Sequence, residues 1–181
     1  MTPERVVDEA AQVAAEAGLD GLTLAAVADR LGVRTPSLYK HVAGLPDLRR
    51  LLAVRAKRDL AAVLTRAAVG RSRRDALLAL AAAYRDWAGA HPGLYSAAQA
   101  APAADDSDDQ EASAAVVGVV FDVLRGYGAD DDTLVDATRT LRAGLHGFAA
   151  LDAAGGYALS RPLDDSVAWW LDSLDAALSR G

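Results

Sequence analysis

A short segment from Thr35 to His41 gathers side chains that can bind a polyanion. Two hydroxyls, a phenol, an ammonium and an imidazole lie close together in it. These candidates are Thr35, Ser37, Tyr39, Lys40 and His41. Such groups donate hydrogen bonds to phosphate oxygens and to the base edges of a DNA major groove. The segment therefore indicates contact with double-stranded DNA.

Three of these side chains also have a purely structural interpretation. Tyr39 could serve as a core aromatic residue, and His41 could pack under the following helix. Thr35 could act only as a helix N-cap, although capping is compatible with a DNA contact. The residue types alone leave both interpretations open.

The elements around this segment have the spacing of a helix-turn-helix. Thr23 is a suitable N-cap for a short helix, and Gly32 a suitable end for it. Ala28 lies four residues before Gly32, and Leu38 lies six residues after it. Two helices that cross at about 90–120° need a small residue at their contact, and the turn favours glycine because glycine adopts positive φ without strain. Leu38 would then anchor the second helix in the core.

The rest of the chain predicts helices and almost no strand. Apolar residues recur at helical spacing, and strict alternation is nearly absent. Helices are expected over 3–17, 23–31, 35–43, 46–69, 72–90, 112–127, 133–154 and 166–179. A break is expected at 91–93, a solvated loop over 102–111, and a cap for the last helix at 164–166. We therefore predict an all-α chain of about nine helices.

The charge is distributed unevenly along the chain. Residues 1–74 hold 13 Lys and Arg against 8 Asp and Glu, whereas residues 75–181 hold 6 against 17. A basic N-terminal part on an acidic body is typical of a small DNA-binding head on a body that does not bind DNA. Ordinary fluctuation of charge along the sequence is the alternative.

Several function classes are excluded by what the sequence lacks. The 181 residues include no cysteine and three histidines without zinc-site spacing, so we expect no metal. No P-loop, G-x-G-x-x-G or G-x-S-x-G motif is present, so we expect neither an enzyme nor a cofactor. The acidic N-terminus and the lack of a long apolar run predict a soluble, cytoplasmic protein with no membrane contact.

The motifs of the N-terminal part together resemble the DNA-binding head of the tetracycline-repressor (TetR) family. The family pattern runs G-x-x-x-L-T, h-A-x-x-L-G-V and L-Y-x-H-F/V, followed by an acidic and apolar start to helix four. The matching residues are Gly18, Leu22-Thr23, Val27-Ala28, Leu31-Gly32-Val33, Leu38-Tyr39-Lys40-His41-Val42 and Asp47-Leu48. The resemblance covers roughly residues 3–55. The segment 87–95, W-A-G-A-H-P-G-L-Y, also resembles a motif of a subgroup named for a Trp-His-Gly signature.

This resemblance adds Thr23 and Arg34 to the DNA-contacting set. Thr23 would cap the second helix and offer its hydroxyl or its N–H to a phosphate. Arg34 would lie at the start of the recognition helix, near base edges and phosphates. Tyr39 and His41 would donate hydrogen bonds to phosphate, and Lys40 would reach a guanine edge or a phosphate.

One position departs from the family pattern. Family members usually carry a lysine at the start of helix four that pairs with a phosphate, but residues 43–46 contain no cation. The backbone N–H groups of that helix end could still bind phosphate. Arg49 and Arg50 could compensate, or they could be solvated charges of the helix. The loss of one phosphate contact should lower the slope of log affinity against log salt concentration by about one.

The resemblance further implies two domains and a homodimer. A helix-turn-helix domain is expected over 1–46, and a helical ligand-binding and dimerisation domain over 47–181. Two heads about 34 Å apart read successive major grooves, so the expected partner is a palindromic operator. The predicted dimer interface consists of Leu141, Leu145, Trp169, Trp170 and Leu174. Trp169 could instead cover a loop within one subunit.

The implied function is that of a ligand-responsive regulator, by family default a repressor, which a small apolar or aromatic effector releases from DNA. The predicted effector pocket consists of Tyr84, Trp87, His91, Tyr95, Phe121, Arg142, His146 and Phe148. Its aromatic residues could equally be core residues, and its arginine could pair with the many acids. The alternative function is that of a DNA-binding or protein-interaction regulator without an effector.

Overall fold

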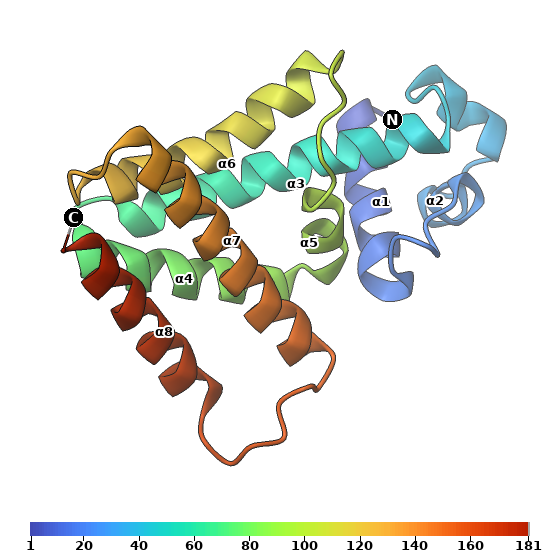
Figure 1. Cartoon of the computed structure of the whole chain (residues 1–181). Coiled ribbons are helices and arrows are strands. Elements are labelled where there is room, and N and C mark those ends of the chain that lie inside the picture. The colour runs from blue at the N-terminus through green and yellow to red at the C-terminus, as the bar shows by residue number, and fades with distance from the viewer. Residues whose placement is uncertain (181) are drawn as a thin grey trace. The chain divides into compact units, whose positions relative to one another are not determined.

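The computed structural model describes residues 1–180, and this part of the chain contains helices and no strand (Figure 1). The all-α prediction is therefore confirmed. The elements are α1 (Pro3–Ala17), α2 (Leu24–Leu31), the 3₁₀ helix η1 (Thr35–Lys40), α3 (Leu45–Ala68), α4 (Arg73–Ala90), α5 (Pro92–Ala98), α6 (Ser107–Arg125), α7 (Asp131–Ala153) and α8 (Leu163–Leu178). None of these helices is both long enough and apolar enough to cross a bilayer.

The chain divides into two compact units, each built from two stretches of sequence. The first unit comprises residues 1–59 and 90–114. It holds α1, α2, η1, α5, the first part of α3 and the start of α6. The second unit comprises residues 60–89 and the chain from Ala115 onward. The functional boundary expected after residue 46 stays a prediction.

Close packing of α1 and α5 organises the first unit. The side chain of Thr2 caps α1 by accepting a hydrogen bond from the Arg5 N–H at 3.4 Å. The helix then contacts α2 and α5 through its buried face. A Cβ atom placed on Gly93 of α5 would lie 2.5 Å from the backbone carbon of Ala14. Only a glycine therefore allows α5 to approach α1 at this distance.

The second unit has a core rich in leucine. Its fully buried side chains include Leu77, Leu80, Leu124, Leu141 and Leu171. The ring of Trp170 on α8 packs directly on the backbone of α7 at Gly144, where a Cβ atom would not fit. The two helices consequently approach each other closely at this level.

The loop predicted over 102–111 is wrong in its second half. The helix α6 begins at Ser107, and the carboxylate of Asp106 accepts a hydrogen bond from the Asp109 N–H at 3.1 Å. Acidic residues in a first helical turn interact favourably with the helix dipole. An acidic stretch that looks solvated in sequence is therefore also a good helix start.

Two other boundaries differ from the prediction. The break expected at 91–93 is confined to His91, because Pro92 starts α5 with its ring at the first helical position. The helix α8 begins at Leu163 after Pro162, which makes no side-chain capping bond. The cap predicted at 164–166 is therefore wrong, and those residues lie inside the first turn.

Candidate DNA interface

The helix-turn-helix is present, and Thr23, Ala28, Gly32 and Leu38 have the positions in it that the sequence predicts. The Thr23 hydroxyl oxygen accepts a hydrogen bond from the Ala26 N–H at 3.1 Å and so caps α2. Gly32 ends the helix in the left-handed region, with φ of 67° and ψ of 31°. Ala28 and Leu38 are buried at 1% and 0% exposure. The small residue, the glycine and the leucine anchor thus have the roles that the spacing predicts.

The expected recognition helix is a single short 3₁₀ element, η1, which ends at Lys40, so the predicted end at residue 43 is wrong. Arg34 precedes it in an extended conformation, and its carbonyl accepts from the Ser37 N–H at 2.9 Å. At the other end, the Leu38 carbonyl accepts from the His41 N–H at 2.8 Å. A 3₁₀ helix has three residues per turn, so side chains three apart lie on one side. With Leu38 in the core, the next two side chains, Tyr39 and Lys40, are exposed.

The structure bears on the alternatives that the sequence left open for this segment. Tyr39 is 60% exposed, so it is no core aromatic residue. Thr35 is the first residue of η1 rather than its N-cap, because Arg34 holds that position without a side-chain bond. Thr35, Ser37 and His41 are half-buried, whereas Arg34 is exposed. The Tyr39 phenol, the Arg34 guanidinium and the Lys40 ammonium are thus the groups of this segment that are most accessible to DNA.

An ion-pair cluster holds α2 against α1. The guanidinium of Arg30 on α2 donates to Glu9 at 3.2 Å and to Glu16 at 2.9 Å, both on α1. The hydrogen bond with Glu9, followed by that with Glu16, raises the pKa of Arg30 above its ordinary value. Arg30 therefore orients α2 within the first unit and is not a free cation for DNA.

The start of α3 carries a carboxylate. The Ala43 N–H donates to Asp47 at 2.9 Å, so a negative group already occupies the helix end expected to bind phosphate. Arg50 donates to Asp47 and to Asp106, each at 3.2 Å. Arg49 donates to a backbone carbonyl between α1 and α2 at 2.9 Å. Both arginines are thus engaged inside the first unit, and neither presents an unpaired cation in place of the missing lysine.

A buried ion pair joins α3 to the start of α6. Lys57 Nζ lies 2.6 Å from the Asp109 carboxylate, and both residues are 4% exposed. Within residues 1–180 they are the buried charged residues. Sequence reasoning missed the pair because Asp109 lies in an acidic stretch that is typical of a solvated loop. A signal was available in Lys57, which is flanked along α3 by the apolar positions Ala53 and Leu60.

The residues predicted to line an effector pocket are divided between the two units. The first unit holds His91 and Tyr95, and the second holds Tyr84, Trp87, Phe121, Arg142, His146 and Phe148. Tyr84 and Trp87 are buried, whereas Arg142 and His146 are exposed. The structure therefore does not place these eight residues in one compact unit, and the pocket stays a prediction.

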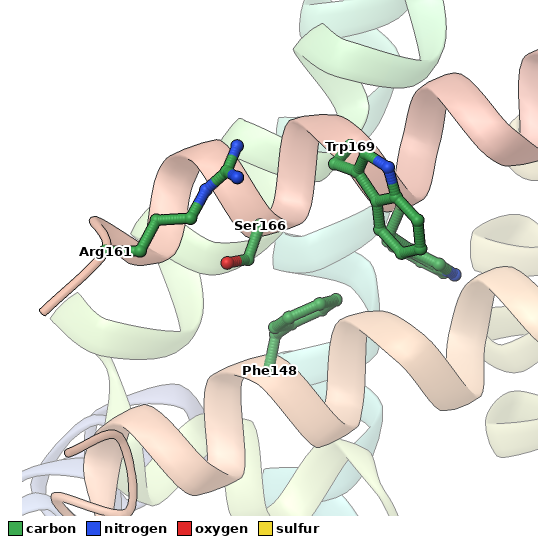
Figure 2. Close-up of a pocket in the computed structure, with 5 residues that line it drawn as sticks. Phe148, Arg161, Ser166 and Trp169 are labelled. Carbon is green, nitrogen blue, oxygen red and sulfur yellow. The ribbon is translucent and has the colours of Figure 1, made fainter. Parts of the chain in front are cut away.

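A hollow of about 380 Å³ opens on the second unit between α7 and α8 (Figure 2). It is lined by Phe148, Arg161, Ser166, Trp169 and Trp170. The ring centroid of Phe148 lies 5.4 Å from that of Trp170 and 6.3 Å from that of Tyr157. The hollow is thus an aromatic depression with one arginine, and it contains Phe148 from the predicted pocket and both tryptophans from the predicted dimer interface.

The predicted interface residues differ widely in exposure. Leu141 and Leu145 are 1% and 2% exposed within the second unit, so they have almost no surface to offer a partner. Trp170 and Leu174 are half-buried. Trp169 is 68% exposed, which is inconsistent with its covering a loop inside the subunit.

The first unit, with its capped α2, its glycine turn and its exposed η1 residues, has the geometry of a helix-turn-helix DNA-binding protein. Residues 6–41 match the family model of bacterial regulatory proteins of the tetR family. Residues 77–174 match the model of the tetracyclin repressor-like C-terminal domain. The chain belongs to the TetR family of DNA-binding transcriptional regulators and is not an enzyme. The Trp-His-Gly subgroup stays a prediction.

Individual relatives agree with this assignment. The chain is 40% identical over 156 residues to the HTH-type transcriptional regulator Rv0681 of Mycobacterium tuberculosis, covering 86% of this chain and 72% of the relative. It is 36% identical over 171 residues to the HTH-type transcriptional regulator YobS of Bacillus subtilis, with coverages of 93% and 88%.

Solved structures show the same fold. A Rhodococcus sp. RHA1 protein of unknown function aligns with a TM-score of 0.82 at 27% identity, over 98% of this chain and 95% of that one. A single-substitution variant of TetR from Acinetobacter baumannii AYE, solved in complex with minocycline, aligns with a TM-score of 0.70 at 25% identity. That alignment covers 97% of this chain and 94% of the TetR variant.

Proposed function

We propose that this regulator is a cytoplasmic repressor that binds a palindromic operator as a homodimer and leaves it when a small apolar or aromatic effector binds. The observation that carries the proposal is the exposure of Tyr39 and Lys40 on η1 beside the fully buried Leu38. A rigid anchor next to exposed donors is the arrangement that reading a major groove requires.

The DNA contacts are divided between positioning and reading. Phosphate contacts fix the register of the protein, and contacts with base edges select the sequence. We assign phosphate binding to Thr23, Tyr39 and His41, and we place Arg34 and Lys40 within reach of base edges or phosphates. Thr35 and Ser37 complete the set at the start of η1. Repression then follows from occlusion of the promoter.

The homodimer follows from the size of the reading element. One η1 presents too few contacts to select an operator among genomic sites, so two heads are needed. We place the interface on α7 and α8 and centre it on Trp169, with Trp170 and Leu174 beside it. Leu141 and Leu145 are left out because their side chains are already buried in the protomer.

Two observations support the effector proposal. They are the aromatic side chains of the second unit and the TetR variant solved with minocycline. The second unit contains buried and half-buried aromatic side chains, which suit an apolar or aromatic molecule. An effector that binds better to one arrangement of the two heads shifts the dimer away from the operator geometry.

The test is a titration of the purified protein against the DNA upstream of its own and neighbouring genes, with footprinting at two salt concentrations. A repressor dimer should protect a two-fold symmetric site and lose affinity steeply as salt rises. Aromatic and apolar compounds that abolish the footprint would identify the effector class. Equal binding to every duplex at both salt concentrations would contradict a specific operator.

A further inference from the structure

A series of polar contacts connects the first turn of α6 to the turn that follows η1. The Asp106 carboxylate accepts hydrogen bonds from Arg50 Nη1 at 3.2 Å and 3.3 Å. Arg50 Nε donates to Asp47 at 3.2 Å, and Asp47 accepts from the Ala43 N–H at 2.9 Å. Asp106 is therefore linked to the turn 41–44, although it lies far from that turn in the sequence.

The turn 41–44 affects DNA binding because it follows the reading segment directly. His41, which we assign to a phosphate, begins the turn, and Lys40 immediately precedes it. Gly44 has φ of 133°, and a glycine has more backbone conformations open to it than other residues. The arrangement of this turn therefore depends on the contacts that hold it, and Asp47 supplies one of them.

Asp106 is held firmly enough to orient Arg50. Its side chain is 13% exposed, and its carboxylate also accepts from the Asp109 N–H at 3.1 Å. Asp109 is buried against Lys57, and Gln110 Nε2 donates at 2.7 Å to a carbonyl of the loop before α6. These bonds fix the chain on both sides of Asp106, so a carboxylate with little freedom faces Arg50.

We propose that Asp106 is a positioning residue for DNA binding, which acts through Arg50 and Asp47 to hold the turn after η1 in its DNA-reading arrangement. The predicted domain boundary after residue 46 places Asp106 in the body, whereas the structure groups residues 90–114 with the helix-turn-helix. This inference rests on the operator of the proposed function and adds a residue that acts on operator binding without a DNA contact of its own.

Electrostatics alone predicts the opposite effect of losing this side chain. Asp106 carries a negative charge on the unit that holds the helix-turn-helix, so its removal should strengthen the attraction to phosphate. In the positioning role, its removal frees Arg50 and Asp47, and only a fraction of the molecules then holds the turn correctly. The apparent affinity falls in proportion to that fraction. The sign of the change in affinity therefore distinguishes the two roles.

The variant Asp106→Ser tests this sign, because serine caps a helix about as well as aspartate but is too short to reach Arg50. The matched control is Asp105→Ser, which removes the same charge from the neighbouring, exposed side chain. Fluorescence anisotropy measures the affinity of each for the footprinted site and for a scrambled duplex. We expect Asp106→Ser to bind the footprinted site about 10-fold more weakly than Asp105→Ser does. The two should bind the scrambled duplex equally, since both keep the cations on which non-specific binding depends.

Arg50→Met breaks the same series of contacts from α3 and completes a double-mutant cycle. In the Arg50→Met background, Asp106→Ser should no longer weaken binding to the footprinted site, because the contact is already lost. Circular dichroism checks that each chain is folded. If Asp106→Ser does not fold, Arg50→Met leaves the cap of α6 intact and should still lose more affinity for the footprinted site than for the scrambled duplex.

Three results would overturn the inference. They are an Asp106→Ser chain that binds the footprinted site like Asp105→Ser, a loss shared equally by the scrambled duplex, and single losses that add fully in the double variant. A wild type that binds both duplexes alike would instead refute the operator itself.

Discussion

Among individual residues, DNA binding depends on which cations near η1 are free of protein partners. Arg30, Arg49 and Arg50 all donate to groups inside the first unit. Arg34 and Lys40 are exposed, and within residues 1–180 neither has an ion pair. A guanidinium already bound to protein acceptors must give up those bonds to contact DNA. We therefore expect the unpaired cations beside η1 to carry the attraction.

Replacing Lys40 tests this expectation. Lys40→Met should weaken binding to every duplex and lower the slope of log affinity against log salt by about one, because one phosphate contact is lost. Fluorescence anisotropy titrations at several salt concentrations measure both effects. The matched control is Arg66→Met, since Arg66 is an exposed cation of α3 in the second unit. A Lys40 variant with an unchanged slope would contradict a phosphate contact.

The phenol of Tyr127 makes the free energy of unfolding depend on pH in the alkaline range. Burial raises the pKa of its phenol, and so does the hydrogen bond that it donates to Asp175 at 2.5 Å. The folded state therefore holds the phenolic proton more tightly than the unfolded state does. Its contribution to stability is present below the unfolded pKa of about 10 and is lost as pH rises above it, by up to about 1.4 kcal/mol per pH unit.

Urea unfolding from pH 8 to pH 11 measures this effect. The free energy of unfolding should decline less above pH 10 in Tyr127→Phe than in the wild type. Tyr157→Phe, which alters a half-exposed ring in the loop before α8, should decline as the wild type does. Parallel curves for the wild type and Tyr127→Phe would show that the phenol of Tyr127 is not the linked group.

Among the helices, the register of α6 on α3 depends on Lys57 and Asp109. Removing one partner of a buried ion pair leaves an uncompensated charge, which costs about 3–5 kcal/mol, whereas replacing both by apolar residues is often neutral. Lys57→Met should therefore be strongly destabilising, and Lys57→Met with Asp109→Leu should lie close to the wild type. Arg55→Met breaks two exposed pairs, with Asp8 and with Asp59, each at 2.8 Å, and should cost less than about 1 kcal/mol.

Chemical denaturation of these three variants gives the comparison. If the double variant is as unstable as Lys57→Met alone, the pair is not the cause of the loss, and packing around Lys57 would be responsible instead.

The contact between α5 and α1 depends on Gly93. A methyl group there would lie 2.5 Å from backbone atoms of Ala14 and Ala15, so one helix must move. Gly93→Ala should destabilise the protein by about 1–3 kcal/mol, the usual cost of overpacking. Gly89→Ala, four residues earlier in α4, meets no atom within 4 Å and should be neutral or slightly stabilising. Equal thermal stabilities of the two variants would contradict the close approach.

These helices also show what a sequence can predict. The caps Thr2 and Thr23 and the Gly32 turn were predictable because they depend on residues a few positions apart. The start of α6 was missed although its signal is local, since Asp106 accepts a hydrogen bond from the Asp109 N–H three residues on. The burial of Asp109 was not predictable, because the Lys57 ammonium that binds its carboxylate lies 52 residues away. The burial of Leu141 and Leu145 was missed for a similar reason. A helical stripe indicates an apolar face but not whether a neighbouring helix or a second copy covers it.

For the whole molecule, charge and symmetry determine how the protein meets DNA. Residues 1–74 carry a net charge of +5 and the remaining residues −11. The cations Arg66, Arg71, Arg73 and Arg74 of this stretch lie in the second unit, however, and the first unit with its acidic residues 105–111 holds 9 Lys and Arg against 13 Asp and Glu. The net charge of the first unit therefore does not attract DNA, and local cations such as Arg34 and Lys40 supply the attraction. The dimer then adds selectivity, because two heads must match two half-sites simultaneously.

The central claim is that two copies of this chain bind one operator through their η1 segments. The most direct test is the stoichiometry of the complex, measured by sedimentation equilibrium on a DNA fragment that carries the footprinted site. We predict two chains per duplex on the full palindrome and a large loss of affinity when one half-site is scrambled. A single chain bound with equal affinity to the full site and to the half-site would contradict the claim.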